Sequence, residues 1–183
     1  TTSRDVPKIM AIASQGSSLY IYEISPEMIQ GKKGTICSGY WELTPETGLV
    51  EGKLPVATSA YFDRMFYYAV GNKIYRADLT RSTPRSYEIY AHPDPSVRIT
   101  RLKFRSQRED RWDISGGDEV EAIPYDFVSY LGGVAEYPDG NCSMLEMKLT
   151  AAGEIDKEEG TKDLMVYEFK GFKNVVDFVY AFK

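Results

Sequence analysis

The residues best suited to binding chemistry lie in one charged segment in the second half of the chain. It reads REDRWD at positions 108–113 and GGDE at positions 116–119. Aromatic rings offer flat faces on which a sugar ring can stack, and carboxylates accept hydrogen bonds from hydroxyl groups. The simpler alternative is a solvated loop that a tryptophan anchors. The expected ligand-binding residues are Trp112, Asp113, Asp118, Glu121 and Tyr125.

The same acidic residues are also candidate calcium ligands, because Ca²⁺ prefers several oxygen donors. Their spacing does not reproduce the Asp-x-Asp-x-Asp-Gly pattern of calcium-binding loops, so we expect no metal site. The glycine pairs Gly116-Gly117 and Gly132-Gly133 do not lead from a strand into a helix with a phosphate-binding lysine. We therefore expect no cofactor.

His92 is the only histidine, so a Ser-His-Asp or Cys-His catalytic group would have to include it. Pro93 and Pro95 follow it closely and indicate a rigid loop between strands, which favours a surface or turn histidine. Hydrolysis by paired carboxylates needs two acids held across a cleft. Acidic residues are plentiful here, but no pair stands out from the sequence. We expect no catalytic residues, with a glycoside hydrolase or lyase as the alternative.

Composition restricts the class of protein and its partners. The chain has 183 residues, of which 43% are hydrophobic, and a net charge of -5. Such a chain can bury a substantial core, and its acidic balance argues against nucleic-acid binding. Cys37 and Cys142 lie far apart and show no metal-ligand spacing, so we expect two unlinked, buried thiols. No apolar run is long enough for a membrane helix.

The segment Met65–Leu79 predicts a tight β-hairpin. Two runs rich in aromatic and β-branched residues flank Gly71-Asn72, a dipeptide that accepts positive φ. Weaker versions of this hairpin occur at 9–24, with a turn at 15–18, and at 131–149, with a turn at 138–141. In the first of them, alternation places Leu19, Ile21 and Glu23 on one face. Further strands are expected at 35–43, 54–62, 87–90, 97–104, 164–169 and 175–182, with a turn at Lys170-Gly171.

These strands recur in the same order, which indicates a repeated unit. A series of four-stranded antiparallel units with insertions confined to loops is typical of a β-propeller. The strands are apolar on both faces, so each sheet needs a neighbour on each side. We predict a single all-β, propeller-type domain over residues 1–183, with about three blades at 8–62, 63–104 and 128–183 and an insertion loop at 105–127.

Three units are fewer than the four to eight of a closed propeller. Either further blades lie upstream in a longer parent chain, or the domain is an incomplete arc or a sandwich of similar hairpins. The chain begins Thr-Thr-Ser-Arg without an initiator methionine, which favours the first alternative.

FYYAVGNKIY at positions 66–75 and GFKNVVDFVY at positions 171–180 carry a family resemblance. With these motifs the chain resembles the C-terminal part of the PKD-like surface lipoproteins of Bacteroidetes. The resemblance implies a propeller-like region in an extracellular protein at the outer-membrane surface, whose lipid anchor lies outside this sequence. Members commonly sit beside glycan-uptake systems, which implies a role in binding or adhesion. It supplies no catalytic residues.

We therefore expect a non-catalytic extracellular binding or adhesion module, whose partner is a glycan or a surface protein. The alternatives are the propeller-type glycoside hydrolase or lyase mentioned above and a structural scaffold that positions other modules.

Overall fold

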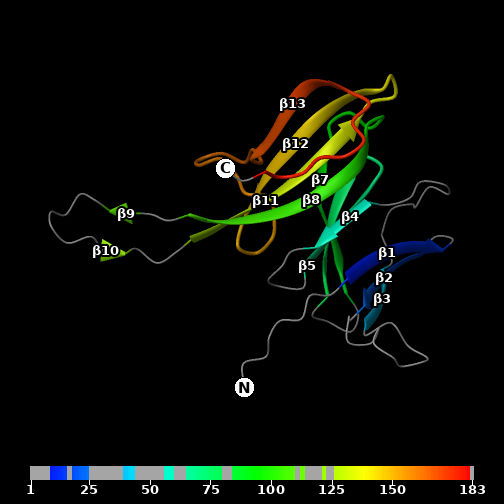
Figure 1. Ribbon diagram of the computed structural model, residues 1–183, viewed down its shortest axis with the longest axis horizontal. Helices are drawn as coiled ribbons and strands as arrows, with labels where there is room; N and C mark the ends of the chain where they lie inside the picture. The colour runs from blue at the N-terminus through cyan, green and yellow to red at the C-terminus, as the bar shows by residue number, and fades with distance from the viewer. Residues whose placement is uncertain are drawn as a thin grey trace.

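The computed structural model describes most of the second half of the chain and the strands of the first half. The described residues are 9–15, 18–24, 39–43, 56–59, 65–79, 84–109, 112–113, 121–122 and 126–181. All regular structure within these ranges is β, as expected from the sequence (Figure 1). The described residues contain no helix that is long and apolar enough to cross a membrane.

The strands form three antiparallel sheets and a short two-stranded ladder, and each sheet is a meander in chain order. The first sheet has the order β1-β2-β3, the middle sheet β4-β5-β6-β7, and the last sheet β8-β11-β12-β13. The strands of the first sheet are β1 (Ile9–Gln15), β2 (Ser18–Ile24) and β3 (Gly39–Leu43). Those of the middle sheet are β4 (Val56–Ser59), β5 (Met65–Val70), β6 (Lys73–Asp78) and β7 (Ser86–Ala91).

The last sheet is the largest. Its strands are β8 (Arg98–Glu109), β11 (Asp126–Glu136), β12 (Asn141–Leu149) and β13 (Val166–Lys173). The remaining ladder pairs β9 (Trp112–Asp113) with β10 (Glu121–Ala122). Hydrogen bonding therefore joins β4 to β5 and β8 to β11. The repeat units predicted from the sequence instead separate β4 from β5 and β8 from β11, because they place a boundary after β4 and another within β8.

All three expected hairpins are present. Gly71 has a φ of 61° at the turn between β5 and β6, a left-handed conformation that glycine adopts without steric cost. The hairpin β11–β12 turns at 137–140, where Gly140 has a φ of 82°. In the hairpin β1–β2, Leu19, Ile21 and Glu23 are buried on one face, as the alternation predicts.

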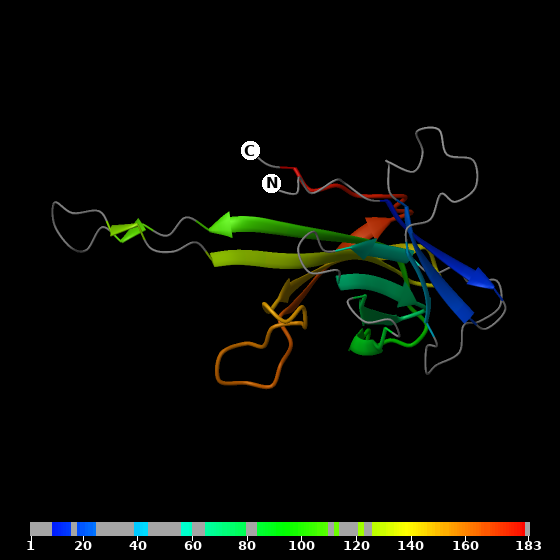
Figure 2. The same ribbon diagram turned by 90° about the horizontal axis from the view of Figure 1, so that it is seen from below.

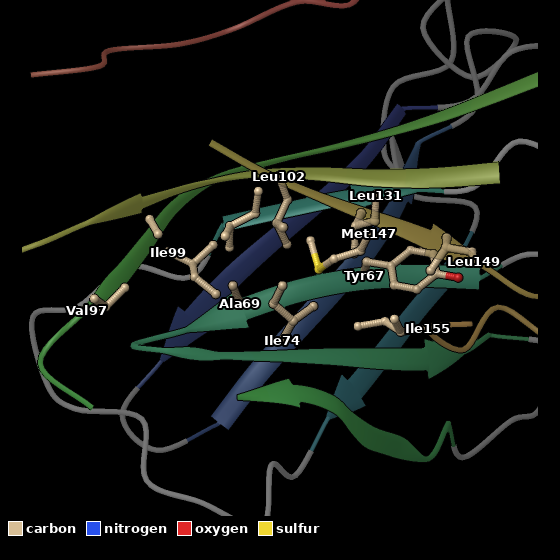
Figure 3. Close-up of a cluster of buried hydrophobic side chains, with 12 residues drawn as sticks. Tyr67, Ala69, Ile74, Val97, Ile99, Leu102, Leu131, Met147, Leu149 and Ile155 are labelled. Carbon is tan, nitrogen blue, oxygen red and sulfur yellow. The ribbon is translucent and has the colours of Figure 1, made fainter. Parts of the chain in front are cut away.

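The middle sheet lies between the other two and is apolar on both faces. Phe66 and Tyr68 pack with Leu19 and Ile21 of the first sheet. Tyr67 and its neighbours on the opposite face pack with the last sheet, and Figure 3 shows this second cluster. The need for a cover on each side, inferred from the strand pattern, is met here because successive side chains of a strand point to opposite faces.

The first strands of the three sheets, β1, β4 and β8, lie next to one another, and we call them the innermost strands. β4 lies against β1 on one side and against β8 on the other. One direct contact between the middle and last sheets is the Phe104 backbone N–H, which donates to the Thr58 hydroxyl at 3.1 Å. No closed ring is formed by the described residues, and the propeller arrangement therefore stays a proposal.

The C-terminal part differs from the sequence prediction in two places. Lys170-Gly171 does not form a turn: β13 continues through it, and a register shift opposite Cys142/Ser143 absorbs the irregularity. Residues 175–181 are not assigned as a strand, because their backbone joins no ladder among the described residues. This segment lies instead over the outer face of the last sheet (Figure 2).

The core between the middle and last sheets supplies a test of this packing. Leu131 is fully buried there, whereas Leu164 is 39% exposed. We expect Leu131→Ala to lower the free energy of unfolding by about 2–5 kcal/mol, because it removes apolar contacts and leaves a cavity. The matched variant Leu164→Ala should change it by about 0.5 kcal/mol or less. Denaturant titration measures both values, and equal effects would contradict the arrangement of the sheets.

Candidate functional site

The structure brings three of the five predicted site residues to one short ladder. β9 contains Trp112 and Asp113, and β10 contains Glu121. The register pairs Asp113 with Glu121 and Trp112 with Ala122. The other two predicted residues, Asp118 and Tyr125, lie outside the described residues.

This ladder stands at the end of an arm formed by β8 and β11. β8 does not end at Phe104 but continues to Glu109, so the strands extend into the segment expected to be an insertion loop. β11 pairs with β12 only from Ser129 onward, while its pairing with β8 begins at Asp126. The two strands therefore run on together beyond the rest of the sheet, as Figure 2 shows. We call this extension, residues 107–109 and 126–128, the β8–β11 arm.

The chemistry of the described residues offers no metal centre. No group of three or more His, Cys, Asp or Glu side chains that could hold an ion occurs among them. Cys142 is a free, buried thiol, as expected, and Cys37 lies outside the described part of the chain.

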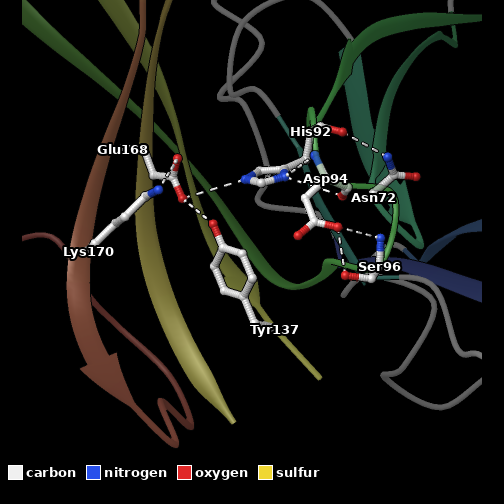
Figure 4. Close-up of polar contacts among 7 residues, drawn as sticks. All are labelled: Asn72, His92, Asp94, Ser96, Tyr137, Glu168 and Lys170. Atoms are coloured by element: carbon white, nitrogen blue, oxygen red, sulfur yellow. Dashed lines mark hydrogen bonds and ion pairs between the residues drawn. The ribbon is translucent and has the colours of Figure 1, made fainter. Parts of the chain in front are cut away.

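A polar group that joins two sheets forms around His92, the histidine that the sequence placed in a loop. His92 follows β7, and its ring lies between the middle sheet and the edge of the last sheet (Figure 4). Its Nε2 is 3.5 Å from Oε1 of Glu168 in β13. The Tyr137 hydroxyl donates to the same carboxylate oxygen at 2.8 Å. The His92 ring also makes edge contacts with the rings of Tyr90 and Tyr137.

His92 was expected to be a surface or turn histidine, and the first of these expectations is wrong. The residue does lie in the turn that joins β7 to β8, but only 5% of it is exposed. The turn is folded back on itself: the Asn72 side chain donates to the His92 carbonyl, and the Asp94 backbone N–H donates to His92 Nδ1 at 3.1 Å. These bonds direct the ring inward, where the last sheet covers it.

The geometry assigns His92 a structural role. Nδ1 lies 3.1 Å from the Asp94 backbone N and 3.3 Å from the Asp94 carbonyl oxygen, so it is engaged within its own turn, while Nε2 faces Glu168. His92 and Glu168, which are far apart in the chain, connect the middle sheet to the last sheet.

Glu168 responds to this environment. Partial burial raises the pKa of its carboxyl, but the neighbouring Ser143 and Tyr137 hydroxyls, the His92 ring and Lys170 together outweigh burial and hold that pKa below its usual value. The charged form is therefore the form that the fold stabilises. The structure places Glu168 opposite the buried Leu145, a pairing that no pattern in the sequence indicated.

Comparison of the chain with family models, with curated proteins and with solved structures finds no match.

The lowered pKa of Glu168 predicts how stability depends on pH. Because the folded-state pKa lies below the unfolded-state value of about 4.3, the carboxylate stabilises the fold above that value, and this contribution is lost as pH falls through the folded-state pKa. Glu168→Gln should therefore cost about 1 kcal/mol or less of unfolding free energy at pH 7, because solvent screens this exposed carboxylate, with the difference from wild type vanishing in acid. Denaturant titrations from pH 7 to pH 3 measure it.

Glu159→Gln, at an exposed position in the 150–165 loop, is the control and should follow the wild type at every pH. A Glu168→Gln cost that stays constant as the pH falls would contradict the role of the carboxylate charge.

Proposed function

We propose that this chain is a non-catalytic binding module, built as consecutive blades of a propeller-type array, that binds its ligand through the end of the β8–β11 arm. One observation carries this proposal: strand pairing continues past the last sheet and leads to a ladder that contains Trp112, Asp113 and Glu121. Binding residues carried on loops and extensions of a rigid β scaffold are a common arrangement.

The propeller-type array is supported by three features of the sheets. Each sheet is an antiparallel meander whose strands follow chain order, with β9 and β10 inserted between β8 and β11 of the last sheet, and a propeller blade is also such a meander. The sheets pack face to face, with the middle one covered on both sides. Their first strands, β1, β4 and β8, are neighbours, as they are around the axis of a propeller.

The ligand class follows from the residue types at the ladder. An indole ring stacks on the apolar face of a sugar, and the carboxylates of Asp113 and Glu121 accept hydrogen bonds from its hydroxyl groups. A glycan therefore fits this chemistry better than a phosphorylated ligand, which acidic residues would repel. The resemblance to the PKD-like surface lipoproteins supports the same proposal and adds an extracellular location, with a lipid anchor outside this sequence.

A glycan array tests the proposal. We expect the wild-type chain to bind one group of related glycans, and Trp112→Ala to weaken that binding by about tenfold or more, because it removes the stacking surface. Tyr87→Ala removes an exposed aromatic ring on β7, away from the ladder, and should leave the binding unchanged. The unfolding midpoint of each variant shows that it is folded.

Two results would contradict the proposal. One is a glycan signal that does not depend on Trp112, and the other is the absence of any signal from the folded wild-type chain. Incubation with polysaccharides and detection of new reducing ends tests catalysis separately. Reproducible release of reducing ends would favour a glycoside hydrolase or lyase.

A further inference from the structure

The residues that follow β13 are held against the outer face of the last sheet. We call residues 175–181 the C-terminal segment. Asp177 lies 3.0 Å from Lys103 Nζ and 3.9 Å from Arg101 Nε, both in β8. The Lys103 ammonium also lies over the ring of Phe178, 5.4 Å from its centroid. Direct hydrogen bonding to Lys103 is the main reason why the pKa of Asp177 is lowered.

Tyr180 is the second anchor of the segment. The Arg105 guanidinium lies over its ring and over that of Tyr130, 5.0 Å and 4.1 Å from the two centroids. Gly132 provides the space below it, because a Cβ at this position would collide with the Tyr180 hydroxyl. Burial raises the pKa of Tyr180 to about 12, so the hydroxyl stays neutral. The segment is therefore fitted to this face.

The C-terminal segment continues the series of neighbouring innermost strands β1, β4 and β8. β4 lies against β1, and β8 lies against β4. The C-terminal segment in turn lies along β8, on the side away from the middle sheet (Figure 2). Its contacts advance in the same direction as β8, from Lys103 with Asp177 to Arg105 with Tyr180. It thus occupies the position that the first strand of a fourth sheet would have.

In each of the three sheets, the innermost strand forms hydrogen bonds with the strand that follows it in the sheet. β1 pairs with β2, β4 with the hairpin β5–β6, and β8 with the hairpin β11–β12. The C-terminal segment has no such partner among the described residues, where its backbone joins no ladder. Val176 and Val179 are 76% and 77% exposed.

The sheet face beside the segment is open as well. Cross-strand pairing places Gly132, Glu146 and Tyr167 in one row, so the row that begins below Tyr180 ends at the edge strand β13. Tyr167, Phe169 and Phe172 of β13 are 41%, 54% and 43% exposed. Exposed aromatic side chains next to an unpaired backbone edge are suited to strand addition.

We propose that the C-terminal segment is the innermost strand of a fourth sheet, and that its free edge and β13 together bind an antiparallel β-hairpin with apolar side chains on both faces. The hairpin pairs with the segment through main-chain hydrogen bonds and covers Tyr167 and Phe169. This inference rests on the propeller-type array proposed above. The ligand is a β-hairpin and not a glycan, and it binds to the last sheet and not to the β8–β11 arm.

A synthetic peptide of residues 65–79 is a suitable probe, because the same hairpin pairs with the innermost strand β4 within the middle sheet. We expect the labelled peptide to bind the full chain, measured by fluorescence anisotropy, and a scrambled peptide not to bind. Phe169→Asp should weaken binding by about tenfold or more, since it places a charge in the apolar contact.

Proline variants test the main-chain pairing. Neighbouring residues of a strand direct their N–H groups to opposite edges, so Val176 and Val179, three positions apart, present theirs to different edges. Of Val176→Pro and Val179→Pro, one should weaken peptide binding by about tenfold and the other should not. Val176→Ala and Val179→Ala keep the N–H group and are the matched controls.

The proposal is overturned if the folded chain does not bind the peptide, or if binding is indifferent to Phe169→Asp and to both proline variants. It is also overturned if sedimentation shows a dimer that Phe169→Asp dissociates, because a second copy then covers the face. Glycan binding through Trp112 is a separate readout, so either proposal can fail while the other stands.

Discussion

The fold depends on the middle sheet having two apolar faces. Phe66 and Tyr68 face the first sheet, while Tyr67 and Ala69, which alternate with them, face the last sheet. A sheet of this kind cannot expose either face to water without losing the burial energy of its aromatic side chains. The hairpin β5–β6 is thus stabilised by cover on both of its faces, and the other two sheets supply that cover. Tyr67 adds a directional element, since its hydroxyl donates to the Gly153 carbonyl at 2.9 Å.

Polar interactions at the margins of the core join the middle sheet to the last sheet and, within the last sheet, one strand to another. His92 and Glu168 connect the turn after β7 to β13, and the Arg105 guanidinium binds Glu146 at 2.6 Å while it lies between two tyrosine rings. Both groups bring together residues from strands far apart in the chain. The His92–Glu168 contact selects one arrangement of the middle and last sheets, because a shift of one over the other would separate this pair. The Arg105–Glu146 pair instead joins two strands of the last sheet, β8 and β12.

Two parts of the molecule extend beyond this stack, and the proposals concern them. The β8–β11 arm carries strand pairing outward to the β9–β10 ladder, away from the layers that bury the core. The C-terminal segment lies on the last sheet, beside the exposed aromatic side chains of β13. A glycan suits the first and a β-hairpin suits the second, because one offers a ring and carboxylates and the other offers a backbone edge and apolar surface.

The sequence by itself determined the local elements. Alternation and the Gly71-Asn72 turn predict the three hairpins and most strands, because both signals are carried by residues next to one another in the chain. The sequence did not predict the partners of every strand. The predicted repeat units group β4 and β8 with the strands before them, whereas both pair with strands that follow them. Hydrogen bonding along a whole strand decides to which sheet it belongs. The structure also showed that Lys170-Gly171 continues β13, where a register shift replaces the expected turn.

Only the tertiary structure decided which polar residues are buried together. His92 has the sequence surroundings of a loop residue, and Glu168 those of an exposed strand position. Their contact arises because the turn after β7 meets β13, an encounter between residues 76 positions apart that no local pattern records. The predicted ligand residues show the converse. Their types were readable in the sequence, but the arm that brings Trp112, Asp113 and Glu121 together is a product of long-range strand pairing between β8 and β11.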